Sequence, residues 1–320
     1  MKFAILGAGA TGGFLGAHLA RAGADVTLIA RGPHLAAMRE RGITVEEPDG
    51  TAFVARPTCT DDLRAVKGAD AVFITLKAHS LPAIAADFGA ALGESAAVVS
   101  CQNGIPWWYA EGLQAVDPGG VVAAAIPRSK VIGCVVYTAT NLKAPGVVEH
   151  IEGDRFSLGE IDGNRSERVA AIAAALTSAG LRAPIQKDLG SEIWVKLLGN
   201  ATFNPLSALT GATLATMASD PGSRELIRGL MTEVESVATA LGVRMPISIE
   251  RRIEGAGKVG EHRTSMLQDL ESGRPLELDA LTGAVIELAD RVNVPVPGLR
   301  VIDAATRLLA QVREQVRTSS

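Results

Sequence analysis

Glycines near the start of the chain have the spacing of a dinucleotide-binding turn. Gly7-Ala8-Gly9-Ala10-Thr11-Gly12 directly follows the apolar run 2–6, and Leu15 and Leu19 then recur at helical spacing. Strand, glycine turn and helix therefore occur in the order that a dinucleotide site needs. We expect Gly7 to make the tight turn, Gly9 to let a pyrophosphate approach the backbone, and Gly12 to let helix and strand pack closely. The helix N-terminus would then offer its N–H groups to the phosphates.

The end of the second predicted strand indicates which dinucleotide binds. The strand covers residues 25–29, and Ala30-Arg31 stand where an NAD site would carry Asp or Glu for the ribose 2′-hydroxyl. An arginine suits a 2′-phosphate, so the sequence favours NADP(H). The alternative is that Arg31 is an ordinary solvated surface residue.

Two further polar residues follow predicted buried strands. Lys77 comes after strand 70–75 and Asn103 after strand 97–100, and ligands bind at the carboxyl ends of parallel strands. A surface lysine and a plain Asn-Gly turn are the alternatives. Trp107-Trp108-Tyr109 follow at once; they wall an apolar substrate pocket, form a subunit contact, or belong to a loop folded onto the core.

A helical segment in the second half carries a polar stripe. Lys196, Asn200 and Asn204 stand at i, i+4 and i+8, so a continuous helix projects all three from one face. One amine and two amides within an otherwise apolar helix suggest a ligand site, although a solvent-facing stripe has the same spacing. Pro205 disfavours the helical conformation at Asn204 and is expected to kink or end the helix there.

Composition narrows the class of protein. The 320 residues suffice for about two domains, and 47% hydrophobic content suits a soluble α/β protein. A net charge of −4 gives no reason to expect nucleic acid or an anionic membrane as a partner. No apolar run is long enough to span a membrane, and no signal peptide precedes the first strand. Three scattered cysteines and five unclustered histidines predict a cytoplasmic protein without disulfides and without a metal site.

The expected fold is α/β, with a Rossmann dinucleotide-binding domain over residues 1–187 and an all-helical domain over residues 188–320. In the first domain we expect a hairpin (43–45 with 51–55), a helix (81–92), an antiparallel pair (131–139 with 147–151), a separate short strand (156–158), a helix (165–178) and a closing strand (183–186). Later helices are expected at 225–241, 247–258, 281–291 and 300–317. These apolar C-terminal helices are compatible with a homodimer and equally with a monomer.

Taken in order, these motifs resemble the ketopantoate reductase (2-dehydropantoate 2-reductase) family along nearly the whole chain. The likeness rests on the glycine turn, Lys77, Asn103-Gly104, the run 196–206, and the run from Ser265 to Glu277. It implies a fold similar to the 6-phosphogluconate dehydrogenase-like proteins, with the active site in the cleft between a Rossmann domain and a helical domain.

The resemblance also implies residue roles. Lys196 would donate the proton to the carbonyl oxygen as hydride reaches C2, and Glu277 would lie near the cofactor and the reacting centre. From the residues alone, an acidic Glu277 is also explained by the dipole of a helix starting there. The implied substrate contacts are Asn103, Asn200, Asn204 and Ser265, with Ser265 at the carboxylate; Ala139, Lys77, Asn103 and Arg31 would contact the cofactor.

The leading hypothesis is therefore NADPH-dependent reduction of 2-dehydropantoate to (R)-pantoate in pantothenate biosynthesis. The alternatives are an oxidoreductase of the same class that acts on another 2-oxo acid or on a 3-hydroxy acid, and a non-catalytic NADP(H) sensor. The sequence departs from the family at Leu209–Thr213, where an Asn is common, and at His262, where some members have an amide. These departures and the aromatic loop bear on substrate identity more than on reaction type.

Overall fold

The computed structural model of the chain describes residues 1–319. The chain forms two compact units, and the main division falls between Leu189 and Gly190. Two short segments of the first half, Asn103–Pro106 and Gly112–Pro118, belong to the second unit. The first unit contains Met1–Gln102, Trp107–Glu111 and Gly119–Leu189.

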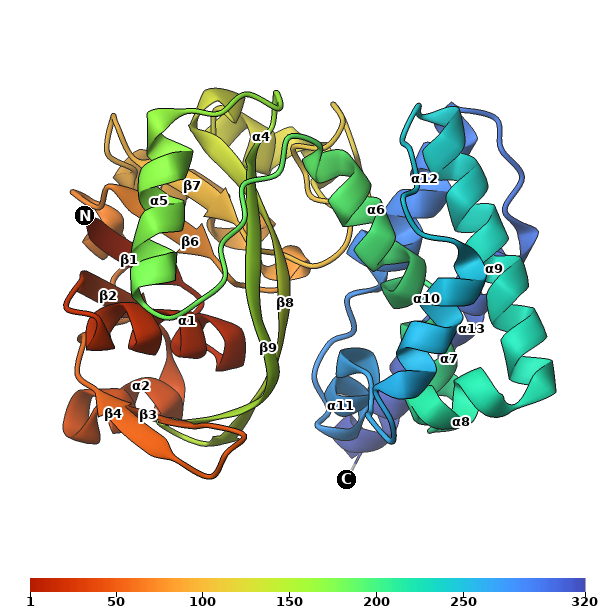
Figure 1. Cartoon of the computed structure of the whole chain (residues 1–320), viewed down its shortest axis with the longest axis horizontal. Helices are drawn as coiled ribbons and strands as arrows, with labels where there is room; N and C mark the ends of the chain where they lie inside the picture. Colours follow the sequence, from red (N-terminus) through yellow and green to blue (C-terminus); the bar gives the residue numbers. More distant parts are fainter. Residues whose placement is uncertain (320) are drawn as a thin grey trace. The chain divides into compact units, whose positions relative to one another are not determined.

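The first unit is built on one nine-stranded sheet in the order β4-β3-β9-β8-β7-β6-β1-β2-β5 (Figure 1). Pairing is parallel except within the hairpins β3/β4 and β8/β9. The strands are β1 (Lys2–Leu6), β2 (Asp25–Ile29), β3 (Ile43–Glu46), β4 (Ala52–Ala55), β5 (Thr58–Thr60), β6 (Ala71–Ile74), β7 (Ala97–Ser100), β8 (Val131–Ala144) and β9 (Val147–Glu160). The helices are α1 (Ala10–Arg21), α2 (Gly32–Arg41), α3 (Ala85–Ala91), α4 (Val121–Ala125) and α5 (Glu167–Ser178).

The central parallel strands are apolar on both sides because both faces of the sheet are covered. Phe3 and Ile5 of β1 share one core cluster with Phe14 of α1 and Ile172 of α5. Side chains alternate along a strand, so Ala4 and Leu6, which are also buried, point to the opposite face. The expected Rossmann-type arrangement is confirmed.

The strands at 131–160 differ from the expectation. Instead of a short pair and a separate strand at 156–158, β8 and β9 are 14 residues each and form one long hairpin. Tyr137 pairs with Arg155 and Ala139 with Glu152, so β9 holds one extra residue between these pairs. Gly153, with φ +73°, lies in this bulge, and pairing resumes beyond it. The polar residues around Gly153, which the sequence suggested as a gap between two strands, therefore form a bulge within one strand.

Two other expected elements are shorter than predicted. In place of one helix at 81–92, the structure has a 3-10 turn, Pro82–Ile84, followed by α3. The closing strand at 183–186 is reduced to isolated bridges, among them Leu158 with Ile185.

The second unit is built of helices (Figure 1). None of the helices within residues 1–319 combines the length and apolarity needed to cross a membrane. They are α6 (Leu189–Asn200), α7 (Phe203–Thr210), α8 (Leu214–Ser219), α9 (Pro221–Ala240), α10 (Ile249–Lys258), α11 (Ser265–Glu271), a π-helical turn (Asp279–Gly283), α12 (Ala284–Arg291) and α13 (Pro297–Ser319).

The helix break near Pro205 lies earlier than expected. α6 ends at Asn200, and Asn204 and Pro205 are in the first turn of α7. A proline ring collides with the carbonyl of residue i−4, here Ala201, so the helix deforms one turn upstream and Pro205 is accommodated near a new N-terminus. Thr202, in the break, donates its hydroxyl to Leu198 O at 2.6 Å. Lys196 and Asn200 lie on α6, but Asn204 lies on α7. The three residues therefore do not share one face of a continuous helix, contrary to the prediction from the sequence.

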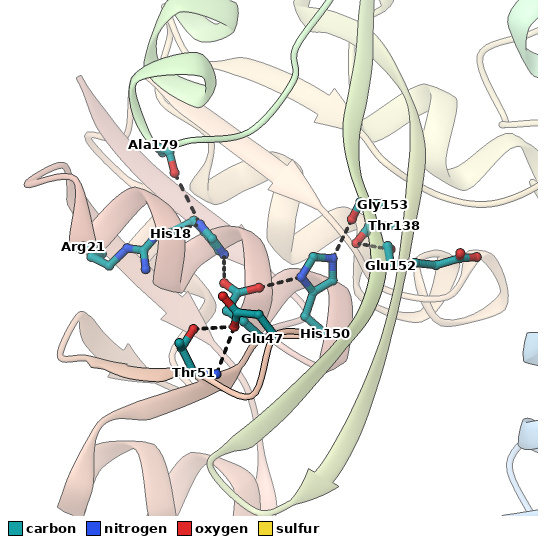
Figure 2. A network of polar contacts seen from close by, with 10 residues as sticks. His18, Arg21, Glu47, Thr51, Thr138, His150, Glu152, Gly153 and Ala179 are labelled. Atoms are coloured by element: carbon teal, nitrogen blue, oxygen red, sulfur yellow. Dashed lines mark hydrogen bonds and ion pairs between the residues drawn. The ribbon is translucent and has the colours of Figure 1, made fainter.

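A buried polar network joins four segments of the first unit (Figure 2). Glu47, which follows β3, has Oε1 3.2 Å from His18 Nε2 of α1 and Oε2 2.6 Å from His150 Nδ1 of β9. His18 Nδ1 lies 3.3 Å from the carbonyl oxygen of Ala179, just beyond α5, and His150 Nε2 lies 2.7 Å from Gly153 O. Burial lowers the pKa of His18, although Ala179 O and the Glu47 carboxylate favour the protonated form.

Stability is expected to fall as the pH falls through about 6.5, the ordinary histidine value. Burial lowers the pKa of both His18 and His34 in the folded chain, so below that pH the unfolded state binds more protons. Urea unfolding between about pH 7.5 and about pH 5.5 measures the effect. His18→Asn is expected to lower stability and flatten its pH dependence, because the substitution removes one of the two buried histidines. An unchanged slope in His18→Asn would contradict this assignment.

Candidate functional site

The turn between β1 and α1 is fixed by backbone hydrogen bonds and close packing. The N–H groups of Gly7 and Ala8 both donate to Ile29 O of β2, at 3.1 and 3.0 Å. Gly7 has φ +101°, and a Cβ on it would lie 2.7 Å from the Leu76 backbone nitrogen. Gly7 thus provides the backbone conformation and the space that the turn requires.

The other two glycines of the turn differ in their surroundings. A Cβ on Gly12 would lie 2.6 Å from Gly7 O and 3.0 Å from the Ile5 side chain, because α1 packs tightly on β1 here. Gly9 is exposed, and a Cβ on it would meet only Gly7 O, at 4.0 Å. As N-cap of α1, Gly9 brings no side chain to the first turn, so the surface over these N–H groups stays open. This open, uncapped helix start fits a dinucleotide pyrophosphate.

Other predicted cofactor residues lie next to this turn. Arg31, exposed, is two residues beyond Ile29, whose carbonyl holds the turn. Lys77 is half-buried and adjoins Leu76, which packs against Gly7. Ala139 of β8 precedes Thr140, whose hydroxyl oxygen lies 3.4 Å from that of Thr11.

Thr75, which follows β6, also stabilises the turn and was not among the predicted site residues. Its hydroxyl donates to Gly7 O at 2.9 Å and so supports the loop from β6. A polar residue at the end of an apolar strand was the available signal in the sequence.

Asn103 and Lys196, which are 93 positions apart, meet within the second unit. Lys196 Nζ of α6 donates to Asn103 Oδ1 at 2.6 Å. Gly104 has φ +82°, and a Cβ on it would lie 2.6 Å from the carbonyl carbon of Ala280. Ile105 N–H donates to Ala280 O at 2.8 Å. The segment that carries Asn103 thus packs against the π-helical turn at 279–283.

The remaining predicted residues lie on other helices of the second unit. Asn200, at the end of α6, is half-buried, and Asn204 of α7 is buried. Ser265 is exposed in the first turn of α11, whose cap is the side chain of Thr264. Glu277 is half-buried, and its carbonyl accepts a hydrogen bond from Leu281 N at the start of the next helix. The structure brings Lys196 and Asn103 into direct contact, and the functional roles of all these residues stay predictions.

The aromatic loop has a structural explanation. Trp107 and Trp108 are 5% and 6% exposed and belong to the first unit. A Cβ on Gly133 of β8 would lie 2.8 Å from the Trp108 ring, and Arg128 donates to Trp108 O. Both rings are therefore buried, and Trp108 packs against β8, as expected for a loop folded onto the core, one of the three possibilities.

Family models match both halves of the chain. A model described as "Ketopantoate reductase PanE/ApbA" matches residues 3–163, and one described as "Ketopantoate reductase PanE/ApbA C terminal" matches residues 188–310. The chain belongs to the ketopantoate reductase family.

Individual members of the family are similar over nearly their full length. The 2-dehydropantoate 2-reductase of Mesorhizobium japonicum is 49% identical over 98% of this chain and 99% of its own. That of Halobacterium salinarum is 30% identical over 96% and 98%. A putative ketopantoate reductase structure from Ralstonia solanacearum superposes with a TM-score of 0.92 at 38% identity, over 98% of each chain. D-Mandelate dehydrogenase with NADH and anilino(oxo)acetate shares the fold, at TM-score 0.85 and 21% identity over 98% of this chain and 99% of that one.

The glycine turn predicts losses of stability of different size for two alanine substitutions. Gly12→Ala forces a methyl group against the Gly7 carbonyl, so we expect a loss of about 1–3 kcal/mol in the free energy of unfolding. Gly9→Ala has room for its Cβ, but the backbone of Gly9 (φ −79°, ψ −145°) lies outside the regions that residues with a side chain favour, so we expect a smaller loss of about 0.5–1 kcal/mol. Chemical denaturation measures both. Equal effects of the two substitutions would contradict the packing described for Gly12.

Proposed function

We propose that this protein reduces 2-dehydropantoate to (R)-pantoate with NADPH, a step of pantothenate biosynthesis. The observation that carries the proposal is the contact of Lys196 Nζ with Asn103 Oδ1, in a chain of this family. This contact supports the proposal because an amine able to donate a proton lies beside an amide able to orient a carbonyl substrate. The proposed domains are residues 1–187 for the cofactor and residues 188–320 for the substrate.

The chemistry divides between the cofactor and the protein. When bound, the reduced nicotinamide supplies a hydride to C2 of the oxo acid. Lys196 Nζ gives a proton to the carbonyl oxygen, so that the carbonyl becomes a hydroxyl and no charge is left on oxygen. Asn103 orients the amine, and we propose that Asn200, Asn204 and Ser265 hold the substrate while Glu277 lies near the reacting centre.

The open turn at Gly7–Gly12 supports a dinucleotide as cofactor, with its pyrophosphate at the start of α1. NADP(H) is proposed over NAD(H) because Arg31 is exposed close to this turn and can pair with a 2′-phosphate. The further cofactor contacts that we propose are Lys77, Asn103, Ala139 and Glu277. A cytoplasmic location and a homodimer stay predictions.

Replacing Lys196 by Ala is expected to lower kcat with 2-dehydropantoate about 10²- to 10⁴-fold, because the proton donor is lost. The initial rate of NADPH oxidation, followed by absorbance, measures this. NADPH affinity, followed by fluorescence, is expected to be unchanged. Lys187→Ala, at an exposed position outside the site, is the control and keeps wild-type turnover.

Unchanged kcat in Lys196→Ala would remove this residue from the mechanism. A panel of other 2-oxo acids in the same assay tests the substrate. A higher kcat/KM for another acid would replace 2-dehydropantoate as the preferred substrate. Tight NADPH binding without turnover of any acid would support the sensor hypothesis instead.

Replacing Arg31 by Ala is expected to raise the KM for NADPH about 10- to 100-fold and to leave the KM for NADH unchanged, since only NADPH carries the 2′-phosphate. Steady-state kinetics with each cofactor measures the two constants. The exposed Arg56 provides the control, Arg56→Ala, for which neither constant changes. A parallel rise in both constants would mean that Arg31 does not select the cofactor.

A further inference from the structure

The start of α2 carries Arg31 but has no side-chain cap. Arg31 is the N-cap residue, and its side chain makes no capping hydrogen bond. Gly32 has φ +64°, and Pro33 has no N–H that could be bonded. Helix ends without such bonds fray, so the position of Arg31 depends on what else holds this turn.

His34, in the first turn of α2, bonds to a segment 112 positions away. The Gly146 N–H donates to His34 Nδ1 at 2.9 Å, and His34 is 8% exposed, so water is kept from this bond. A backbone N–H can only donate, so Nδ1 must be unprotonated and the ring must be neutral, with its proton on Nε2. Burial lowers the pKa of His34 and thereby favours this neutral form.

The turn that contains Gly146 joins β8 to β9 and lies on α2 (Figure 1). Pro145 O accepts a hydrogen bond from Arg41 Nη2, one helical turn and more beyond His34, at 2.7 Å. Gly146 has φ +79°, and a Cβ on it would lie 3.1 Å from the Cβ of Ala37. The hairpin turn is therefore packed closely along α2, and His34 ties the start of the helix to it.

The same imidazole also lies beside the glycine turn. The Ala8 carbonyl raises the pKa of His34, against the larger effect of burial. Within the described residues, Nε2 makes no hydrogen bond of good geometry, so this contact is looser than the one with Gly146. The Ala8 N–H donates to Ile29 O, two residues before Arg31. His34 is thus buried between the glycine turn and the hairpin turn.

We propose that His34 is a positioning residue that holds Arg31 for the 2′-phosphate of NADPH and so sets the preference for NADP(H) over NAD(H). This inference rests on the proposed function and deepens it. His34 is buried and acts through the first turn of α2. NADH has no 2′-phosphate and gains nothing from the placement of Arg31, so loss of the bond to Gly146 affects the two cofactors unequally.

Two substitutions of His34 separate its hydrogen bond from its ring. His34→Phe keeps a ring but leaves the Gly146 N–H buried without an acceptor, whereas His34→Asn brings an oxygen close to the place of Nδ1. Fluorescence titration with NADPH and with NADH, without substrate, measures the two Kd values. His34→Phe is expected to raise the Kd of NADPH about 5- to 20-fold and to leave that of NADH unchanged. His34→Asn is expected to restore the preference for NADPH.

Three further variants sharpen the test. Gly146→Ala is strained at φ +79° and crowds Ala37, so it shifts the turn from α2 and is expected to weaken NADPH binding in the same direction. His34→Phe added to Arg31→Ala is expected to have no further effect, because the group that His34 positions is already gone. Ser166→Ala removes a side-chain bond to a backbone N–H at the start of α5. It is the matched control for lost stability and keeps the wild-type ratio of the two Kd values.

The outcomes separate this inference from the proposed function. His34→Phe with the wild-type ratio, in a protein that prefers NADPH, overturns the role of His34 and leaves the proposed function intact. Equal losses for both cofactors also overturn it, because they indicate general damage to the fold. Wild type that binds both cofactors equally overturns it together with the choice of NADP(H). A preference that depends on His34, in a protein that does not reduce 2-dehydropantoate, upholds the role of His34 and rejects the proposed substrate.

Discussion

The hydrogen bond between Lys196 and Asn103 depends on a chain segment that leaves the sheet. Beyond β7, residues 103–106 belong to the helical unit, where Gly104 packs against Ala280 and the Ile105 N–H meets the Ala280 carbonyl. Without that close backbone approach, the amide of Asn103 would not be held 2.6 Å from the Lys196 amine. A glycine with positive φ and a π-helical turn are the local features that allow it.

The turn between β1 and α1 relies on the same principle of close backbone packing. Gly12 brings α1 against β1, and the Ile29 carbonyl and the Thr75 hydroxyl hold the loop from two neighbouring strands. The exposed Gly9 then leaves the start of α1 without a covering side chain. A rigid support below and an open surface above are what the binding of a pyrophosphate requires.

Gly199 extends this use of glycine to α6 of the second unit. The guanidinium of Arg252, from another helix, occupies the space where a side chain on Gly199 would lie. Neither Gly199 nor Arg252 attracts attention in the sequence, because the spacing of residues within α6 says nothing about what α10 contributes. Only the three-dimensional structure shows that a side chain from a neighbouring helix fills the space beside Gly199.

Local patterns in the sequence were sufficient for the Rossmann strands, the glycine turn and most helices, because hydrophobic periodicity and backbone preferences act over a few residues. They also singled out Lys196 and Asn103, although not their contact, which joins residues 93 positions apart. Tertiary structure decided the long β8/β9 hairpin, where a bulge at Gly153 resembled a strand end, and the helix break at Ala201–Thr202, one turn before the expected place. It also decided that the Trp107 and Trp108 rings are buried and that Arg252 covers Gly199. Each of these depends on packing between distant segments, and sequence spacing carries no information about such packing.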